Sequence, residues 1–168
     1  MLRTLAVAGA GVWLGLLAGS WMIASISFKT AAALAGPDGR RELQERLAGV
    51  SDEGRRQVIR NVASEVNRAM FGRWIVVQLV VGIVTAVLVA RAEGPWPLAA
   101  AALVIAAVQA GLHSPILEIG RAIDFVPRPL APDVAARFGR LHGAYVLLDL
   151  AKAAALVWLV ARLARMGR

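Results

Sequence analysis

An uncharged run of 24 residues, Leu5 to Phe28, is the feature that most constrains how this chain can fold. In the hydrocarbon of a bilayer no water can hydrogen-bond the backbone, and a helix satisfies those backbone groups within one segment. At a rise of about 1.5 Å per residue, the run is long enough to cross roughly 30 Å of hydrocarbon with some tilt. It is also longer than the apolar core of a signal peptide, so we expect a helix that is retained in the membrane.

Three further apolar runs follow along the chain, and no internal repeat or linker divides it. Hydrophobic residues make up 58% of the chain and its mean hydropathy is +0.63, whereas soluble domains contain about 45–50% apolar residues. The sequence therefore predicts an all-α fold, an integral membrane four-helix bundle formed by one membrane domain over residues 1–168. Its transmembrane helices are expected at about 5–28, 74–90, 98–117 and 139–161.

The polar segment 29–73 is expected to be largely helical. Ser51, followed by Asp52 and Glu53, is a favourable N-cap with acidic residues in the first turn. Apolar residues then follow at helical spacing, and no proline occurs from residue 38 to residue 94. This pattern predicts one helix from Asp52 to Ala90, about 58 Å long, with a long amphipathic extension before the second span. The extension is either an arm that docks a partner or a helix that lies against the headgroups.

Polar residues in the last helix, Arg137 to Leu163, form the strongest functional pattern. Four of them are spaced 3, 4 and 3 residues apart, so they share one side of the helix: His142, Tyr145, Asp149 and Lys152. Charges at bilayer depth are costly and usually face the interior of a bundle. Residues of the second and third spans lie at matching depths, which predicts a polar seam of Gln78, Thr85, Gln109, Tyr145, Asp149 and Lys152. The seam is either a structural hydrogen-bond network or a proton or ion path, and Asp149 and Lys152 are spaced to neutralise each other.

Two histidines form a candidate cofactor site. His113 lies near the end of the third span and His142 lies at the start of the fourth, so both are expected near the surface of the long loops. Neutral imidazole ligates haem iron and other metal ions, and a b-type haem or a metal ion is the cofactor that such a pair would hold. The alternative is that both histidines make structural hydrogen bonds between helices.

Three glycines of the first span, Gly11, Gly15 and Gly19, are spaced four residues apart. Such a small-residue face lets a neighbouring helix approach closely, so we expect tight helix packing along it.

The charge pattern indicates which partners the chain has and how it lies in the membrane. The chain carries 19 Lys and Arg against 11 Asp and Glu, and the basic residues lie beside apolar runs without interleaved aromatics. That pattern favours anionic lipid headgroups over nucleic acid. The long-loop side holds 13 Lys and Arg and the opposite side holds five. The positive-inside rule therefore predicts a multi-pass protein of a bacterial inner (cytoplasmic) membrane, with its long loops in the cytoplasm.

Three short motifs resemble a known family. They are Trp13-Leu14-Gly15 in the first span, Pro-Ile-Leu-x-x-x-Arg from Pro115 to Arg121, and Phe138-x-x-Leu141-His142-Gly143 at the start of the last helix. This pattern is similar to the "domain of unknown function 4149", or transmembrane protein 205-like, family from Val12 onward. The resemblance implies a four-helix membrane fold, distantly similar to copper-resistance and haem-binding four-helix proteins, and it implies no defined activity.

The chain contains no nucleophile–base pair, phosphate loop or dense carboxylate set, and it has no cysteine. A role without catalysis is therefore expected: a membrane subunit, or an assembly or stabilising partner, of a larger membrane protein complex. Two alternatives stay open. One is a haem- or metal-binding redox protein that uses His113 and His142, and the other is a small transporter or proton-conducting protein that uses Asp149 and Lys152.

Overall fold

The computed structural model describes residues 1–36 and 39–166, and within these ranges it contains helices and no strand. In chain order the helices are α1 (Leu2–Ala35), α2 (Arg41–Arg46), α3 (Asp52–Arg91), α4 (Trp96–Ala122) and α5 (Pro132–Arg165). Helices α1, α3, α4 and α5 are each long and apolar enough to cross a membrane. The all-helical fold with four long apolar helices is thus confirmed.

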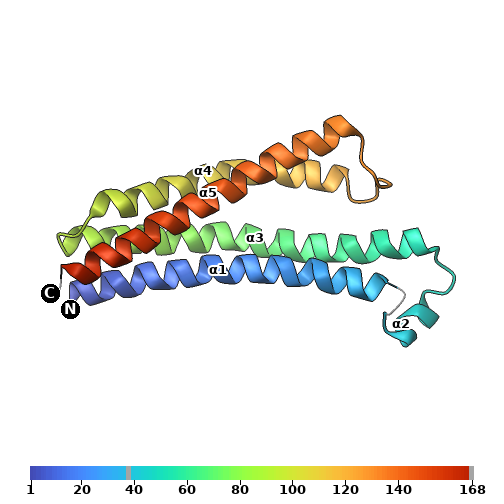
Figure 1. Ribbon diagram of the computed structural model, residues 1–168, viewed down its shortest axis with the longest axis horizontal. Coiled ribbons are helices and arrows are strands. Elements are labelled where there is room, and N and C mark those ends of the chain that lie inside the picture. The colour runs from blue at the N-terminus through green and yellow to red at the C-terminus, as the bar shows by residue number, and fades with distance from the viewer. Residues whose placement is uncertain (37–38, 167–168) are drawn as a thin grey trace.

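The four long helices form a closed ring. Each helix packs against two others, in the order α1, α3, α4, α5 and back to α1. Both termini and the short α3–α4 connection lie at one end, which we call the short-loop end, and α2 lies at the opposite, long-loop end (Figure 1). At the long-loop end, α4 and α5 diverge from α1 and α3 (Figure 1).

The best-packed part of the core lies toward the short-loop end. Trp13 of α1 is fully buried there among alanines of α1 and α4 and leucines of α5. Gly82 of α3 allows this close packing, because a Cβ at that position would lie 2.7 Å from the Trp13 ring. Gly9 of α1 likewise allows close packing against Thr85 of α3, because a Cβ at position 9 would lie 2.9 Å from the Thr85 hydroxyl.

The predicted packing face of Gly11, Gly15 and Gly19 is wrong for contacts within this chain. A Cβ added at any of the three would meet no atom within 4 Å. The reason is that Trp13 and Leu17 are the residues of α1 that point into the core, and the glycine face is turned away from them. Among the described residues, the glycines within helices that lie at close helix contacts are instead Gly9 and Gly82.

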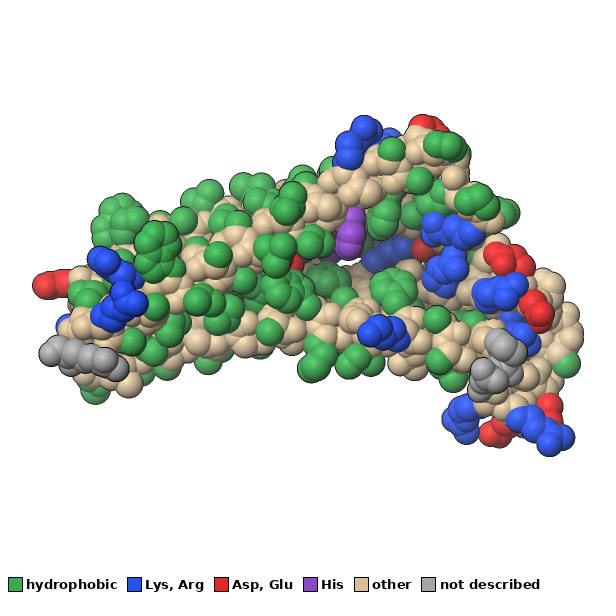
Figure 2. All heavy atoms as spheres, in the orientation of Figure 1, with side chains coloured by type: hydrophobic (Ala, Val, Ile, Leu, Met, Phe, Trp, Pro, Cys, Tyr) green, Lys and Arg blue, Asp and Glu red, His purple; other side chains and the backbone are tan. Residues whose placement is uncertain are grey.

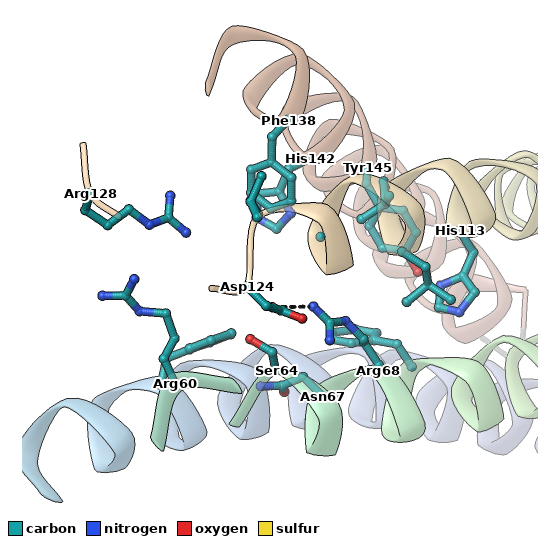
Figure 3. A pocket seen from close by; sticks show the side chains of 16 residues that line it. Arg60, Ser64, Asn67, Arg68, His113, Asp124, Arg128, Phe138, His142 and Tyr145 are labelled. Carbon is teal, nitrogen blue, oxygen red and sulfur yellow. Dashed lines mark hydrogen bonds and ion pairs between the residues drawn. The ribbon is translucent and has the colours of Figure 1, made fainter. Parts of the chain in front are cut away.

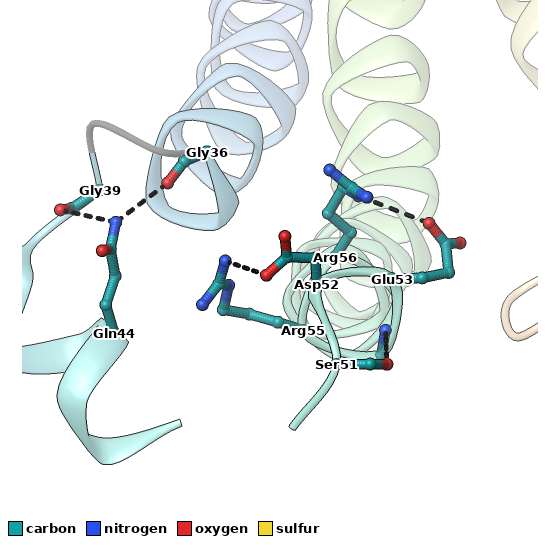
Figure 4. Close-up of polar contacts among 9 residues, drawn as sticks. Gly36, Gly39, Gln44, Ser51, Asp52, Glu53, Arg55 and Arg56 are labelled. Atoms are coloured by element: carbon teal, nitrogen blue, oxygen red, sulfur yellow. Dashed lines mark hydrogen bonds and ion pairs between the residues drawn. The ribbon is translucent and has the colours of Figure 1, made fainter. Parts of the chain in front are cut away.

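Helix α3 begins where its cap predicts. The Ser51 hydroxyl accepts a hydrogen bond from the backbone N–H of Gly54 at 3.1 Å, and ion pairs join Asp52 to Arg55 and Glu53 to Arg56 (Figure 4). The helix then runs unbroken to Arg91, which confirms the predicted single helix.

The extension packs against α1 and does not stand alone. Helix α1 continues past the predicted span to Ala35 and runs beside it (Figure 1). Asn67 of α3 donates to the Ser27 hydroxyl of α1 at 2.6 Å, and Ala31 and Ala63 are buried. One side of the extension is therefore covered by α1, while the opposite side is exposed.

Candidate functional site

A buried polar network lies at the centre of the bundle. Lys152 of α5 is 0% exposed and Asp149, one turn earlier, is 4% exposed. The Lys152 ammonium lies 2.9 Å from Asp149 Oδ1, and it also donates to the Oε1 atoms of Gln78 on α3 and Gln109 on α4. Trp21 Nε1 of α1 donates to Asp149 Oδ2 at 3.0 Å. The network therefore joins all four long helices.

The donors and acceptors of the network match one another. An ammonium group has three protons, and the structure gives Lys152 three acceptors: Asp149, Gln78 and Gln109. The amide nitrogen of Gln109 donates to Asp149 Oδ1 at 2.7 Å and to the Tyr145 carbonyl oxygen at 3.2 Å. A buried ion pair of this kind is tolerated when further hydrogen bonds satisfy its remaining groups. Its first effect is to fix the register of four helices against one another.

The structure assembles the predicted polar seam in part. Gln78, Gln109, Asp149 and Lys152 meet directly, whereas Tyr145 contributes its backbone carbonyl and not its hydroxyl. Thr85 lies two turns along α3 from Gln78, and its buried hydroxyl has no partner among the described residues. The sequence did not predict the contribution of Trp21, because the first span also contains Trp13, whose buried indole N–H has no acceptor among the described residues.

A cavity of about 300 Å³ lies on the long-loop side of the network, where α4 and α5 diverge from α1 and α3. Its apolar wall includes side chains from all four long helices: Phe28, Phe71, Ile116, Leu117, Ile123 and Phe138. Its polar lining consists of Arg60, Ser64, Asn67, Arg68, His113, Asp124, Arg128, His142 and Tyr145. Figure 2 shows the corresponding hollow, with a histidine at its edge and basic side chains beside it.

One ion pair spans the cavity. Arg68 of α3 bonds to Asp124, just beyond α4, at 2.7 Å, and both side chains are nearly buried (Figure 3). This hydrogen bond raises the pKa of the Arg68 guanidinium above its usual value, despite the opposing effect of burial. Arg68 also pairs with Glu65 on its own helix. The pair is 56 residues apart in the chain, so no local pattern in the sequence could have revealed it.

The two candidate haem ligands both line this cavity. His142 is exposed and stacks on Phe138, with ring centroids 5.6 Å apart. His113 faces α3, where its Nε2 would lie 3.9 Å from a Cβ on Gly72. In Figure 3 the two imidazoles lie on either side of Tyr145. Within the described ranges, no group of three or more His, Cys, Asp or Glu side chains could hold a metal ion.

A comparison of the chain with models of protein families, with curated proteins and with solved structures finds no match in any of the three.

Proposed function

We propose that the chain is an integral membrane protein whose four long helices cross a bacterial inner membrane, with the long-loop end in the cytoplasm. The outward sides of the helices support this location. Large apolar residues such as Val80, Val104 and Leu147 point outward along the apolar runs, while charged side chains gather mainly at the long-loop end (Figure 2). Soluble monomers rarely expose contiguous apolar surface on that scale. Membership of the "domain of unknown function 4149" family is part of the same proposal.

Within that membrane, the proposed role is that of a subunit or assembly partner without catalysis. The closed polar network supports it, because Asp149 and Lys152 bond to each other and to neighbouring side chains. The outer faces of the bundle are then the surfaces through which the protein acts.

An exposed stripe of valines on α3 is the main support for this proposed role. Val58, Val62 and Val66 are spaced four residues apart and are each about half exposed. They lie in the polar extension, before the apolar run that begins near residue 74. Lipid tails would not cover an apolar stripe at this level. A helix of another protein would, in the way that i, i+4 apolar positions anchor a helix in a groove.

Site-specific photocrosslinking in native membranes tests this role. A photoreactive residue replaces Val62, and in a second variant it replaces Val80, which is similarly exposed on α3 but lies within the apolar run. The expected result is one discrete adduct with another protein at position 62 and lipid adducts at position 80. Lipid or water adducts alone at both positions would contradict the proposal, as would adducts with a second copy of this chain only.

A haem-binding redox role stays the second candidate, because His113 and His142 line one cavity. The absorption spectrum of the purified protein tests it.

A further inference from the structure

Two arginines at the mouth of the cavity have no acidic partner among the residues that the structure describes. Arg60 comes from α3 and Arg128 from the α4–α5 connection, and both side chains extend into the opening (Figure 3). Among the described residues, four other arginines at this end pair with acids close in sequence: Arg40, Arg41, Arg55 and Arg56. Other arginines at this end also have no acidic partner among the described residues, but they do not line the cavity: Arg46, Arg121, Arg137 and Arg140. Arg68 pairs with Asp124. Two unpaired guanidinium groups at one opening repel each other, and an anion between them removes that repulsion.

Deeper in the cavity, two buried polar atoms have no hydrogen-bond partner in the described structure. One is the hydroxyl of Tyr145, a residue that is 9% exposed, and the other is Oδ1 of Asn67, which is 5% exposed. The Tyr145 ring is held edge-on by Phe71, at 6.5 Å between centroids. Buried polar groups are normally satisfied, so a donor and an acceptor left open in one cavity point to a polar group that enters it.

The remaining wall is apolar and lies at the right depth for an acyl chain. Phe71 and Leu117 line the cavity at the ends of the apolar runs of α3 and α4. Arg60 lies on the other side of that boundary, about 16 Å farther along α3 from Phe71 at 1.5 Å per residue. The cavity therefore spans the level at which hydrocarbon gives way to headgroups.

We propose that this cavity binds one anionic phospholipid. Its phosphate lies between Arg60 and Arg128, an ester carbonyl accepts from the Tyr145 hydroxyl, and the start of an acyl chain packs on Phe71 and Leu117. A free phosphate ion would meet the two arginines but would leave the apolar wall and Tyr145 unused. This inference rests on the membrane location proposed above and goes beyond it by assigning a ligand to the cavity.

Mass spectrometry of the intact full-length protein in a non-ionic detergent tests the site. Phosphatidylglycerol is titrated against wild type and against the double variant Arg60→Gln/Arg128→Gln. We expect one tightly bound lipid per wild-type chain. In the variant, binding should weaken roughly thirtyfold, because each basic residue near an anionic lipid contributes about fivefold.

The double variant Lys29→Gln/Arg46→Gln is the matched control. Both residues are exposed at the same end and do not line the cavity, and the change in net charge is identical. Its affinity should equal that of wild type. Since Arg60 and Arg128 have no bonded partner to lose among the described residues, the thermal midpoint of their variant should also match wild type.

Two further measurements distinguish a bound lipid from a simpler ligand such as phosphate. Tyr145→Phe should weaken phosphatidylglycerol binding about fivefold, which corresponds to one lost hydrogen bond. Inorganic phosphate alone should displace the lipid only at far higher concentration, because each buried methylene group of the chain strengthens binding by roughly fourfold.

Three outcomes would overturn the inference: equal affinity for phosphatidylcholine and phosphatidylglycerol, wild-type affinity in the Arg60→Gln/Arg128→Gln variant, or displacement by inorganic phosphate at the lipid's own concentration. Alkaline carbonate extraction of membranes separates this failure from that of the proposed function. If the chain stays in the membrane but does not bind the lipid, only the lipid-site inference fails. A chain that is released into the supernatant overturns both proposals.

Discussion

Asp149 uses both of its oxygens to join three helices. Oδ1 accepts from Gln109 and lies against the Lys152 ammonium, while Oδ2 accepts from Trp21. The spacing in α5 predicted the bond between Asp149 and Lys152, because one helical turn separates them. The bond to Trp21 could not be predicted in the same way, since the two residues are 128 positions apart and meet only through the packing of α1 against α5.

Replacement of Lys152 tests whether the network holds the bundle together. Lys152→Met is expected to lower the free energy of unfolding by about 3–5 kcal/mol, because it leaves the Asp149 carboxylate buried without its countercharge. The double variant Asp149→Leu/Lys152→Met should recover much of that loss, since both charges are then gone. Unfolding by denaturant in detergent measures the difference. If the double variant were no more stable than Lys152→Met, the charge pair would not be the cause.

Asp149→Asn separates the structural reading of the network from a proton path. The amide keeps the shape and one acceptor, so a purely structural site should tolerate this change better than Asp149→Leu. A proton path would be lost in Asp149→Asn while the protein stayed folded. Proton flux into vesicles that contain each purified variant, compared with its thermal midpoint, is the measurement. Wild-type stability in both variants would place Asp149 in contact with water or headgroups.

The histidines have an equally direct test. If His113 and His142 ligate haem b, the purified protein shows a Soret absorption band, and His113→Ala or His142→Ala abolishes it without loss of membrane insertion. Because His142 stacks on Phe138 and is exposed, His142→Ala should barely change stability by itself. A purified wild-type protein without a Soret band and without stoichiometric metal would remove the cofactor hypothesis.

At the scale of helices, local signals predicted the boundaries of α3. The Ser51 cap and the absence of proline predicted the start and continuity of α3, which begins at Asp52 as expected. The end of α1 was missed: Lys29 and Thr30 mark the end of the apolar run but do not break a helix, and the alanines that follow continue it to Ala35. Hydropathy predicts where a helix can cross lipid, and it does not predict where the helix ends.

Glycine positions give a test at the same scale. Gly82→Ala is expected to destabilise the bundle by about 1–3 kcal/mol, because its Cβ would lie 2.7 Å from Trp13 and 2.9 Å from Leu103. Gly11→Ala is the matched control, with nothing within 4 Å of the added Cβ. It should be neutral or slightly stabilising, since alanine is the better helix former. Thermal unfolding in detergent ranks the two variants, and the reverse order would mean that α1 and α3 do not meet through Gly82.

For the whole molecule, the structure places both termini at one end. Arg3 near the N-terminus donates to the Met166 carbonyl oxygen near the C-terminus, and the long connections lie at the opposite end (Figure 1). An even number of long helices that run antiparallel in chain order requires this arrangement, so it followed from the count of apolar runs. The divergence of α4 and α5 at the long-loop end, and hence the cavity, depends on side-chain packing between distant segments and had no signal in the sequence.

Orientation in the membrane is the prediction at this scale. The excess of Lys and Arg at the long-loop end, 13 against five, predicts that this end lies in the cytoplasm and both termini lie outside. A phosphatase reporter that is active only outside the cytoplasm should therefore be active when it is fused to the C-terminus. A fluorescent reporter that matures only inside should be dark at the same position. The opposite pair of results would invert the topology.

The short distance between Asp149 and Lys152 also bears on how the chain is made. On the membrane location proposed above, the described helices enter the bilayer in chain order, so α5 enters after α1, α3 and α4 and before it packs against them. A lone carboxylate or ammonium at mid-helix costs about 2.5–3.5 kcal/mol on insertion scales. Because the two groups lie one turn apart and 2.9 Å from each other, they enter the bilayer as a neutral pair. Trp21, Gln78 and Gln109 then bind a helix that has already crossed.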